Sequence, residues 1–204
     1  MSFGGFITRL MDICLSIIFI VFLLPIFLLL MVVVKWDSKG PIFFKQSRIG
    51  KNGKIFRIVK FRTMIMNSEE VLKNNTALYK KYVKNSYKLD PFEDPRITKV
   101  GEFLRKTSLD EIPQFFNVLK GEMSLVGPRP ILDDELKEYG KYAEKFLSVK
   151  PGITGYWQVS GRSDVGYPER VDLELYYVDR KSISFDFYIL LKTFITVVKK
   201  KGAY

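Results

Sequence analysis

The sequence predicts a mostly helical α+β protein that carries a membrane anchor at its N-terminus. Three observations support this prediction: a long uncharged apolar segment, one hairpin signal and several amphipathic stretches further along the chain. At 204 residues the chain has room for one full domain and a short appendage. We therefore expect an anchor over residues 1–40 and a folded domain over residues 41–204.

The apolar segment runs from Ile13 to Val34 and contains no charged residue. A helix of this length would be about 33 Å long, which is enough to cross the hydrocarbon core of a bilayer. Pro25 lies near its middle, where it removes one backbone hydrogen bond and favours a kink. Two arrangements stay open: a spanning helix, or a re-entrant helix that bends at Pro25 and returns both ends to one face. Basic residues concentrate after the segment, and this places that side in the cytoplasm.

The hairpin signal is Asn52-Gly53, which separates two runs rich in apolar residues. Strand alternation over 54–62 puts Lys60 and Arg62 on the same face as Phe56 and Ile58. Nine basic residues and one acid lie between positions 35 and 63. Binding of substrate phosphates and contact with anionic lipid headgroups explain this charge equally well.

The remaining predicted elements are helices. Residues 68–89 have the pattern of one or two amphipathic helices, and Lys99 to Lys106 is a further helical stretch. Residues 185–198 combine large apolar side chains with few charges, which is typical of a core helix or of an interfacial amphipathic helix.

The composition excludes several kinds of site. The chain has no histidine and a single cysteine, so it cannot form a Cys/His zinc site, a Ser-His-Asp triad or an intramolecular disulfide. Proton transfer and metal binding therefore fall to carboxylates, lysines or tyrosines, and carboxylates favour hard ions such as Mg²⁺. The net charge of +11 favours anionic partners.

Ser108-Leu109-Asp110-Glu111 has two interpretations. Ser-x-x-Glu is the pattern of a capping box, in which Ser108 would cap a helix and Glu111 would reach back to it. A later helix start, with Asp110 at the cap, would instead place Pro113 in the first turn. In the functional interpretation, one carboxylate attacks phosphorus while its neighbour orients a metal ion or a proton.

Two further motifs could bind a phosphorylated ligand. Pro128 and Pro130 fix the backbone around Arg129, so its guanidinium loses little freedom when it binds a phosphate. The run from Trp157 to Arg162, which includes Gln158, brings together the polar and aromatic groups that a nucleotide pocket needs. Each motif alone is also explained as an ordinary turn.

Taken together and in order, these motifs resemble the monotopic polyprenyl-phosphate phosphoglycosyl transferases, the bacterial sugar transferase family. The resemblance covers the chain from Arg9 to the C-terminus, and its most similar branch transfers galactose or glucose 1-phosphate. The matching stretches are Arg9-Leu10-Met11-Asp12, Phe44 to Gly50, Lys60 to Met64, Asp94 to Thr98, Ser108 to Gln114, Asn117 to Pro130 and Lys150 to Gly155.

The resemblance implies a two-step reaction in which Asp110 attacks the β-phosphate of a UDP-sugar, UMP leaves, and polyprenyl (undecaprenyl) phosphate then takes the phosphosugar. It implies Mg²⁺ as the cofactor, held beside Asp110 and Glu111. The expected phosphate-binding residues are Lys60, Arg62, Arg96 and Arg129, and the expected nucleotide or sugar pocket contains Pro128, Pro130, Gln158 and Arg162. The family's anchor is a re-entrant helix broken at a proline, although Leu24 stands where the family often has serine.

The resemblance also implies partners and a location. We expect a catalytic domain on the cytoplasmic face of the bacterial inner membrane, which contacts membrane lipid and performs the first membrane step of capsule, O-antigen or exopolysaccharide assembly. A homodimer and downstream glycosyltransferases are compatible with this role, and no nucleic-acid partner is expected. A UDP-N-acetylhexosamine donor and a non-catalytic basic membrane adaptor are the alternatives.

Overall fold

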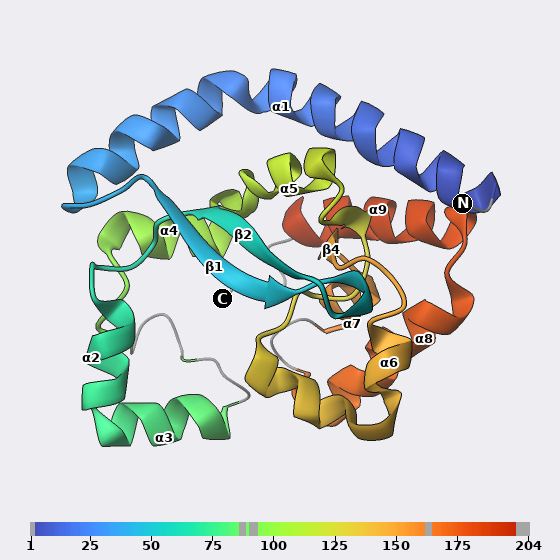
Figure 1. The fold of residues 1–204 in the computed structure, drawn as a ribbon. Helices are drawn as coiled ribbons and strands as arrows, with labels where there is room; N and C mark the ends of the chain where they lie inside the picture. Colours follow the sequence, from blue (N-terminus) through green and yellow to red (C-terminus); the bar gives the residue numbers. More distant parts are fainter. Residues whose placement is uncertain (1–2, 86–88, 90–93, 162–164, 199–204) are drawn as a thin grey trace.

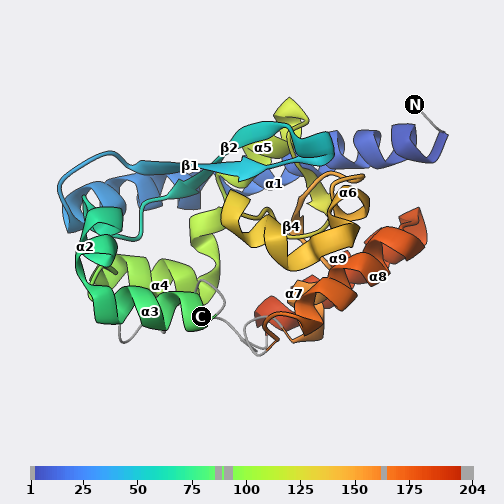
Figure 2. The ribbon, with the colours of Figure 1, turned by 60° about the horizontal axis from the view of Figure 1, so that its bottom comes forward.

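The computed structural model describes residues 3–85, 89, 94–161 and 165–198, and it is mostly helical with two small sheets. Figures 1 and 2 show helices α2, α3 and α4 at one end of the molecule and α6 to α9 at the other, with the hairpin β1–β2 running between them. The larger elements are α1 (Phe3–Asp37), β1 (Phe43–Ile49), β2 (Ile55–Phe61), α2 (Ser68–Asn74), α3 (Thr76–Lys84), α4 (Lys99–Thr107), α5 (Gln114–Lys120), α8 (Glu169–Arg180) and α9 (Ile183–Val198). The shorter ones are the 3-10 turns η1 (Lys51–Gly53), η2 (Leu109–Glu111) and η3 (Asp133–Tyr142), together with β3 (Ser124–Val126), α6 (Ala143–Phe146), β4 (Gly152–Thr154) and α7 (Tyr156–Ser160).

Helix α1 lies along the rest of the molecule instead of standing apart from it, and Figure 1 shows it arching over α4, α5 and α9. The α1 residues that pack against the domain recur every three or four positions, so they form one side of the helix. They run from Asp12 and Leu15 through Leu23 and Phe27 to Val34. By length and composition α1 could cross a membrane, and only 11% of its most apolar window is buried.

The kink expected at Pro25 is not confirmed, because every residue from Phe3 to Asp37 is helical. Two polar side chains of α1 reach the domain. Arg9 donates to the carbonyls of Val118 and Leu119 at 2.6 and 2.7 Å. The Asp12 carboxylate accepts from the backbone N–H of Leu125 at 2.9 Å. Both polar side chains therefore attach α1 to the domain.

The predicted hairpin is confirmed: β1 pairs antiparallel with β2, from Phe43 opposite Phe61 to Ile49 opposite Ile55. Asn52 and Gly53 both have positive φ (56° and 75°), the conformation that an Asn-Gly turn tolerates. On β2 the side chains of Phe56 and Ile58 are buried in the main core, as the alternation predicts. Asn117 of α5 binds the other edge of β2, because its side chain accepts from Val59 N–H at 3.0 Å and donates to Arg57 C=O at 2.8 Å.

The helices predicted around residues 68–89, 99–106 and 185–198 are present as α2 with α3, α4 and α9. The N-terminus of α4 presses on the end of β2 at Gly101, where an added Cβ would lie 2.1 Å from the carbonyl oxygen of Thr63. Only glycine permits this approach. It brings the C-terminal end of α4, and the turn that follows, close to β2.

The capping box at Ser108 is not formed. Ser108 has a φ of 57° and ends α4, and its side chain makes no capping bond to η2. Asp110 and Glu111 lie in the 3-10 turn, and α5 begins only at Gln114, after Pro113. The later helix start considered from the sequence is not found either, because Asp110 is not a cap residue and Pro113 is the N-cap of α5 and not part of its first turn. At the N-cap the missing N–H of Pro113 costs nothing.

Candidate active site

The centre of the candidate site is the pair Asp110 and Glu111 facing Lys60. The ammonium of Lys60, near the end of β2, lies 2.6 Å from Glu111 Oε1 and 3.7 Å from Asp110 Oδ2. Asp110 is 8% exposed. Lys60 therefore contacts both carboxylates of the pair. The helical turn alone would point these two neighbouring side chains in different directions, so the contact depends on the position of β2.

Burial raises the pKa of Asp110 to about 6, and the neighbouring Glu111 carboxylate acts in the same direction. The positive charges of Lys60 and Arg105 oppose this rise and stabilise the ionised form. Asp110 is therefore ionised near neutral pH while it is held in a largely water-free position. A carboxylate in this state is available for attack on an electrophilic phosphorus atom.

Arg105 is a site residue that the motifs did not reveal. It lies in the last turn of α4, and its Nε donates to Thr63 Oγ1 at 2.9 Å. Burial lowers the pKa of Arg105, whereas the carboxylates of Asp110 and Asp94 raise it. The only local signal is that Arg105 falls in the last turn of a helix that ends just before the carboxylate pair, and the packing of that helix decides whether the two meet.

Arg62 is not brought to the carboxylate pair, although Lys60 lies only two residues away. Its guanidinium donates to the carbonyls of Ser38, Lys39 and Val34, at 2.5, 3.0 and 3.2 Å, and so caps the C-terminal end of α1. These bonds use the donors that a substrate phosphate would need. The geometry therefore gives Arg62 a structural role and does not support the predicted phosphate contact.

Arg96 is held by a buried partner. Its Nε and Nη2 donate to the two carboxylate oxygens of Asp94 at 2.8 and 2.7 Å, and both side chains are almost fully buried. The guanidinium also lies 5.9 Å from the ring centre of Tyr82 on α3. Because Asp94 already compensates its charge, Arg96 is a weaker candidate for binding phosphate than Arg105.

Arg129 lies between two buried prolines, as the motif predicts. The loop is fixed beneath it: Pro128 C=O accepts from Gly152 N–H at 2.8 Å, and Gly127 N–H donates to Thr154 C=O at 2.9 Å. Within the described part of the chain, the Arg129 guanidinium is paired with no carboxylate. It is half-buried and lies 5.8 Å from the ring centre of Trp157.

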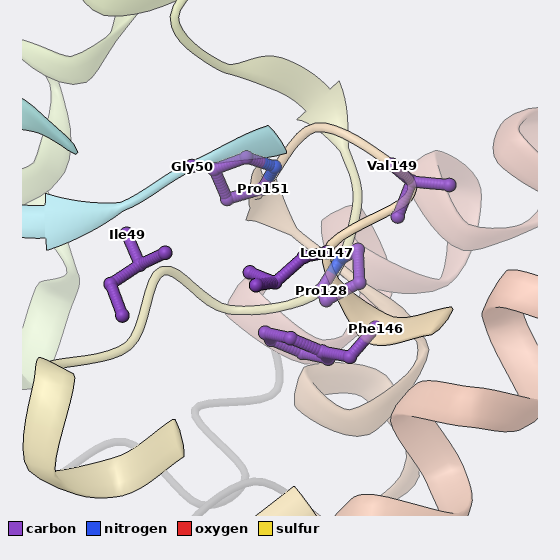
Figure 3. A pocket seen from close by; sticks show the side chains of 7 residues that line it. All are labelled: Ile49, Gly50, Pro128, Phe146, Leu147, Val149 and Pro151. Carbon is purple, nitrogen blue, oxygen red and sulfur yellow. The ribbon is translucent and has the colours of Figure 1, made fainter. Parts of the chain in front are cut away.

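The predicted nucleotide pocket is described only in part. Gln158 lies on α7, and its Oε1 is buried with no hydrogen-bond partner among the described residues. Arg162 lies outside the described residues. Pro128 lines a shallow hollow with an empty volume of about 170 Å³. Figure 3 shows that its seven lining residues come from the end of β1 with the glycine that follows it, from the Pro128 loop and from the segment around Phe146 to Pro151. None of the seven is charged, so this hollow is not suited to nucleotide phosphates.

The chemistry of the site suits a divalent cation and phosphates. No group of three or more carboxylate, histidine or cysteine side chains gathers in the described ranges. Mg²⁺ commonly takes one or two carboxylates and completes its shell with substrate phosphates and water. Asp110 and Glu111, both within 4 Å of one ammonium group, provide such a pair.

Comparison with known proteins gives one consistent result. The chain matches the family described as Bacterial sugar transferase over residues 3–200. It is 45% identical over 205 residues to exopolysaccharide production protein ExoY of Sinorhizobium fredii, a match that covers 98% of this chain and 89% of that protein. It is 47% identical over 202 residues to undecaprenyl-phosphate galactose phosphotransferase of Salmonella typhimurium, covering 98% of this chain and 42% of that protein.

A third relative acts on a different hexose. UDP-glucose:undecaprenyl-phosphate glucose-1-phosphate transferase of Escherichia coli is 38% identical over 202 residues, covering 95% of this chain and 40% of that protein. The chain thus spans less than half of the two hexose-phosphate relatives and most of the ExoY relative. The expected family is confirmed over nearly the whole sequence: the chain belongs to the bacterial sugar transferase family of enzymes.

Proposed function

We propose that this protein transfers a hexose 1-phosphate from UDP-galactose or UDP-glucose to undecaprenyl phosphate and releases UMP. The observation that carries the proposal is the buried Asp110 carboxylate, which lies 3.7 Å from the Lys60 ammonium and has a pKa of about 6. The relatives named for galactose and glucose transfer to undecaprenyl phosphate support the choice of substrates. A UDP-N-acetylhexosamine donor is the alternative within the same chemistry.

The reaction has two steps with balanced bonds. In the first, an oxygen of the Asp110 carboxylate bonds to the β-phosphorus of the UDP-sugar. The bond from that phosphorus to the bridging oxygen breaks, and UMP leaves with the oxygen and its electron pair. In the second, a phosphate oxygen of undecaprenyl phosphate attacks the same phosphorus, the aspartyl–phosphorus bond breaks, and the carboxylate is restored.

The neighbouring residues stabilise charge during these steps. Lys60 and Arg105 favour the ionised form of Asp110 before attack, and afterwards they offset the charge of the transferring phosphoryl group. Arg129 provides a guanidinium fork for a phosphate of the donor. Mg²⁺, when bound beside Asp110 and Glu111, would offset the negative charge of the diphosphate.

We place the enzyme at the cytoplasmic face of the inner membrane, with α1 as a shallow, re-entrant anchor. This topology is supported by the contacts of α1, which reach from Asp12 to Val34 on one side of the same domain. A vertical spanning helix would hold that domain inside the hydrocarbon. The other side of α1 is apolar and exposed, as are Phe187, Leu191 and Phe194 on α9, which contacts α1. We propose that these two faces lie together at the lipid interface.

The test of the reaction is UMP release from a panel of UDP-sugars by the purified full chain, with undecaprenyl phosphate and Mg²⁺ in detergent. We expect release with UDP-galactose or UDP-glucose, and release with a UDP-N-acetylhexosamine alone would establish the alternative donor. If UMP is released from none of the UDP-sugars, the proposed activity is wrong, and a basic membrane adaptor becomes the better description.

The topology is tested by labelling single cysteines with a membrane-impermeant reagent. In a Cys14→Ser background, Gly4→Cys marks the start of α1, and Lys54→Cys, at the exposed tip of the hairpin, marks the side of the domain. We expect both to be labelled in inside-out vesicles and neither in intact cells. Labelling of Gly4→Cys in intact cells would establish a spanning helix. The homodimer and the downstream glycosyltransferases stay predictions.

A further inference from the structure

The backbone of the Arg129 loop is held by buried charged side chains that the reaction scheme does not use. The backbone N–H of Arg129 donates to Glu174 Oε1 at 3.3 Å, and Glu174 is 1% exposed. The next carbonyl, that of Pro130, accepts from Arg48 Nη1 at 3.4 Å. Tyr139 OH donates to the second carboxylate oxygen of Glu174. The loop is therefore fixed on both sides of Arg129 by side chains from distant elements.

Arg170 organises this buried network. Its Nε donates to Glu174 Oε1 at 3.2 Å, and its Nη1 lies 3.5 Å from Glu135 Oε2. Arg170 is 2% exposed, so burial of its charge is tolerable only because two carboxylates face it. The charge of Arg170 is thus paired with carboxylates, whereas none of the described carboxylates pairs with Arg129.

Trp157 connects the network to the side chain of Arg129. The Arg170 guanidinium lies 4.5 Å from the Trp157 ring centre, and the Arg129 guanidinium lies 5.8 Å from it. The indole N–H donates to the carbonyl of Val165 at 3.0 Å, which fixes the orientation of the ring. Trp157 is 2% exposed, so its ring cannot stack on a uracil base. An arginine beside an aromatic ring is attracted to it and loses part of its freedom.

We infer that Trp157, supported by Arg170 and Glu174, is a positioning residue that orients Arg129 toward a phosphate of the nucleotide donor. The inference rests on the proposed function, because it takes the ligand of Arg129 to be a diphosphate. Glu174 fixes the backbone of Arg129, and Trp157 restricts its guanidinium. Arg170, whose charge is paired with carboxylates, contacts both Glu174 and Trp157 and so holds them in place.

The experiment is a double-mutant cycle on the affinity for UDP with Mg²⁺, measured by calorimetry on the full chain in detergent. The variants are Trp157→Leu, Arg129→Ala and their combination. We expect Arg129→Ala to weaken UDP binding by about tenfold or more, as the loss of a charge-assisted hydrogen bond does. Trp157→Leu should weaken it by several-fold, with no further loss in the Arg129→Ala background. Trp157→Phe, which keeps a ring, should restore most of the affinity.

The control is Val171→Ala on α8, next to Arg170, at a side chain buried in the adjoining core. It should lower the melting temperature and leave the affinity for UDP unchanged.

Equal losses from Trp157→Leu in both backgrounds would overturn the inference, as would unchanged affinity in either single variant. If Trp157→Leu does not fold, the same cycle with Trp157→Phe decides, since a residual loss must vanish when Arg129 is absent. If the wild-type protein binds UDP but releases no UMP from any UDP-sugar, the proposed function is refuted. The cycle would still test whether Trp157 acts through Arg129, because it measures only the affinity for UDP.

Discussion

Replacing Lys60 by methionine tests whether this lysine sets the ionisation of Asp110. The two charged groups are 3.7 Å apart, and the Lys60 side chain is 22% exposed. At an effective dielectric constant of about 20, Coulomb's law gives about 4 kcal/mol for this distance. Solvent access reduces that value, and an opposite charge this close commonly shifts a pKa by about one to three. We therefore expect the pKa of Asp110 to rise from about 6 to about 7 or 8 in Lys60→Met.

The direction of the pH effect follows from the role of the carboxylate. In the proposed mechanism Asp110 attacks in its ionised form, so activity is expected above its pKa and is lost as the pH falls through it. At pH 6.5 a carboxylate with a pKa of about 6 is roughly three-quarters ionised, whereas one with a pKa of about 7.5 is roughly one-tenth ionised. The acidic limb of the rate profile should accordingly move to higher pH.

The assay is kcat/KM for UMP release between pH 5 and 9, because this ratio reports ionisations of the free enzyme. A general loss of phosphate binding would lower the rate at every pH, and only a changed ionisation moves the limb. Lys45→Met removes the same charge from an exposed position on β1 and should leave the limb near 6. A limb that stays near 6 in Lys60→Met, or moves to lower pH, would refute the reasoning.

Three further predictions follow from the site and the anchor. Asp110→Asn should abolish UMP release and the phosphosugar adduct seen by mass spectrometry, and full activity would overturn the nucleophile assignment. Glu111→Gln should lower kcat at least about tenfold while the protein stays folded, and an unchanged kcat would remove Glu111 from the mechanism. Arg62→Met should destabilise the fold by about 3 kcal/mol, because three carbonyls at the end of α1, that of Val34 fully buried, lose their donor. An unchanged melting temperature would contradict that structural role.

The sequence predicted the local elements well because their signals are local. The Asn52-Gly53 turn, the alternation along β2 and the helices around residues 99–106 and 185–198 depend on neighbours in the chain. The strands β3 and β4 could not be found in this way, because each has three residues and they pair in parallel across a long separation. Their pairing depends instead on close contact of two glycines, since a Cβ on Gly152 would lie 2.1 Å from the backbone nitrogen of Gly127.

Residue type and motif predict which side chains are candidates for the site, but they do not predict which partners each side chain has in the folded protein. Asp110, Glu111 and Lys60 do come together, whereas the resemblance that points to Arg62 and Arg96 as phosphate-binding residues does not reveal which groups they bind within the protein. The carbonyls at the end of α1 and the Asp94 carboxylate had already engaged them. Arg105 was overlooked because no motif marks it, and only the packing of α4 against β2 brings it to Asp110.

The end of β2 links two distant parts of the molecule through two residues. Lys60 contacts the carboxylate pair, and Arg62 holds the end of α1, so the two contacts are separated by about 7 Å of strand. In the proposed arrangement, with α1 at the lipid surface and Asp110 as the nucleophile, this short spacing fixes the height of Asp110 above the acyl chains. An acceptor would then be selected by the level at which its phosphate stands, and the length of its hydrocarbon tail would matter little.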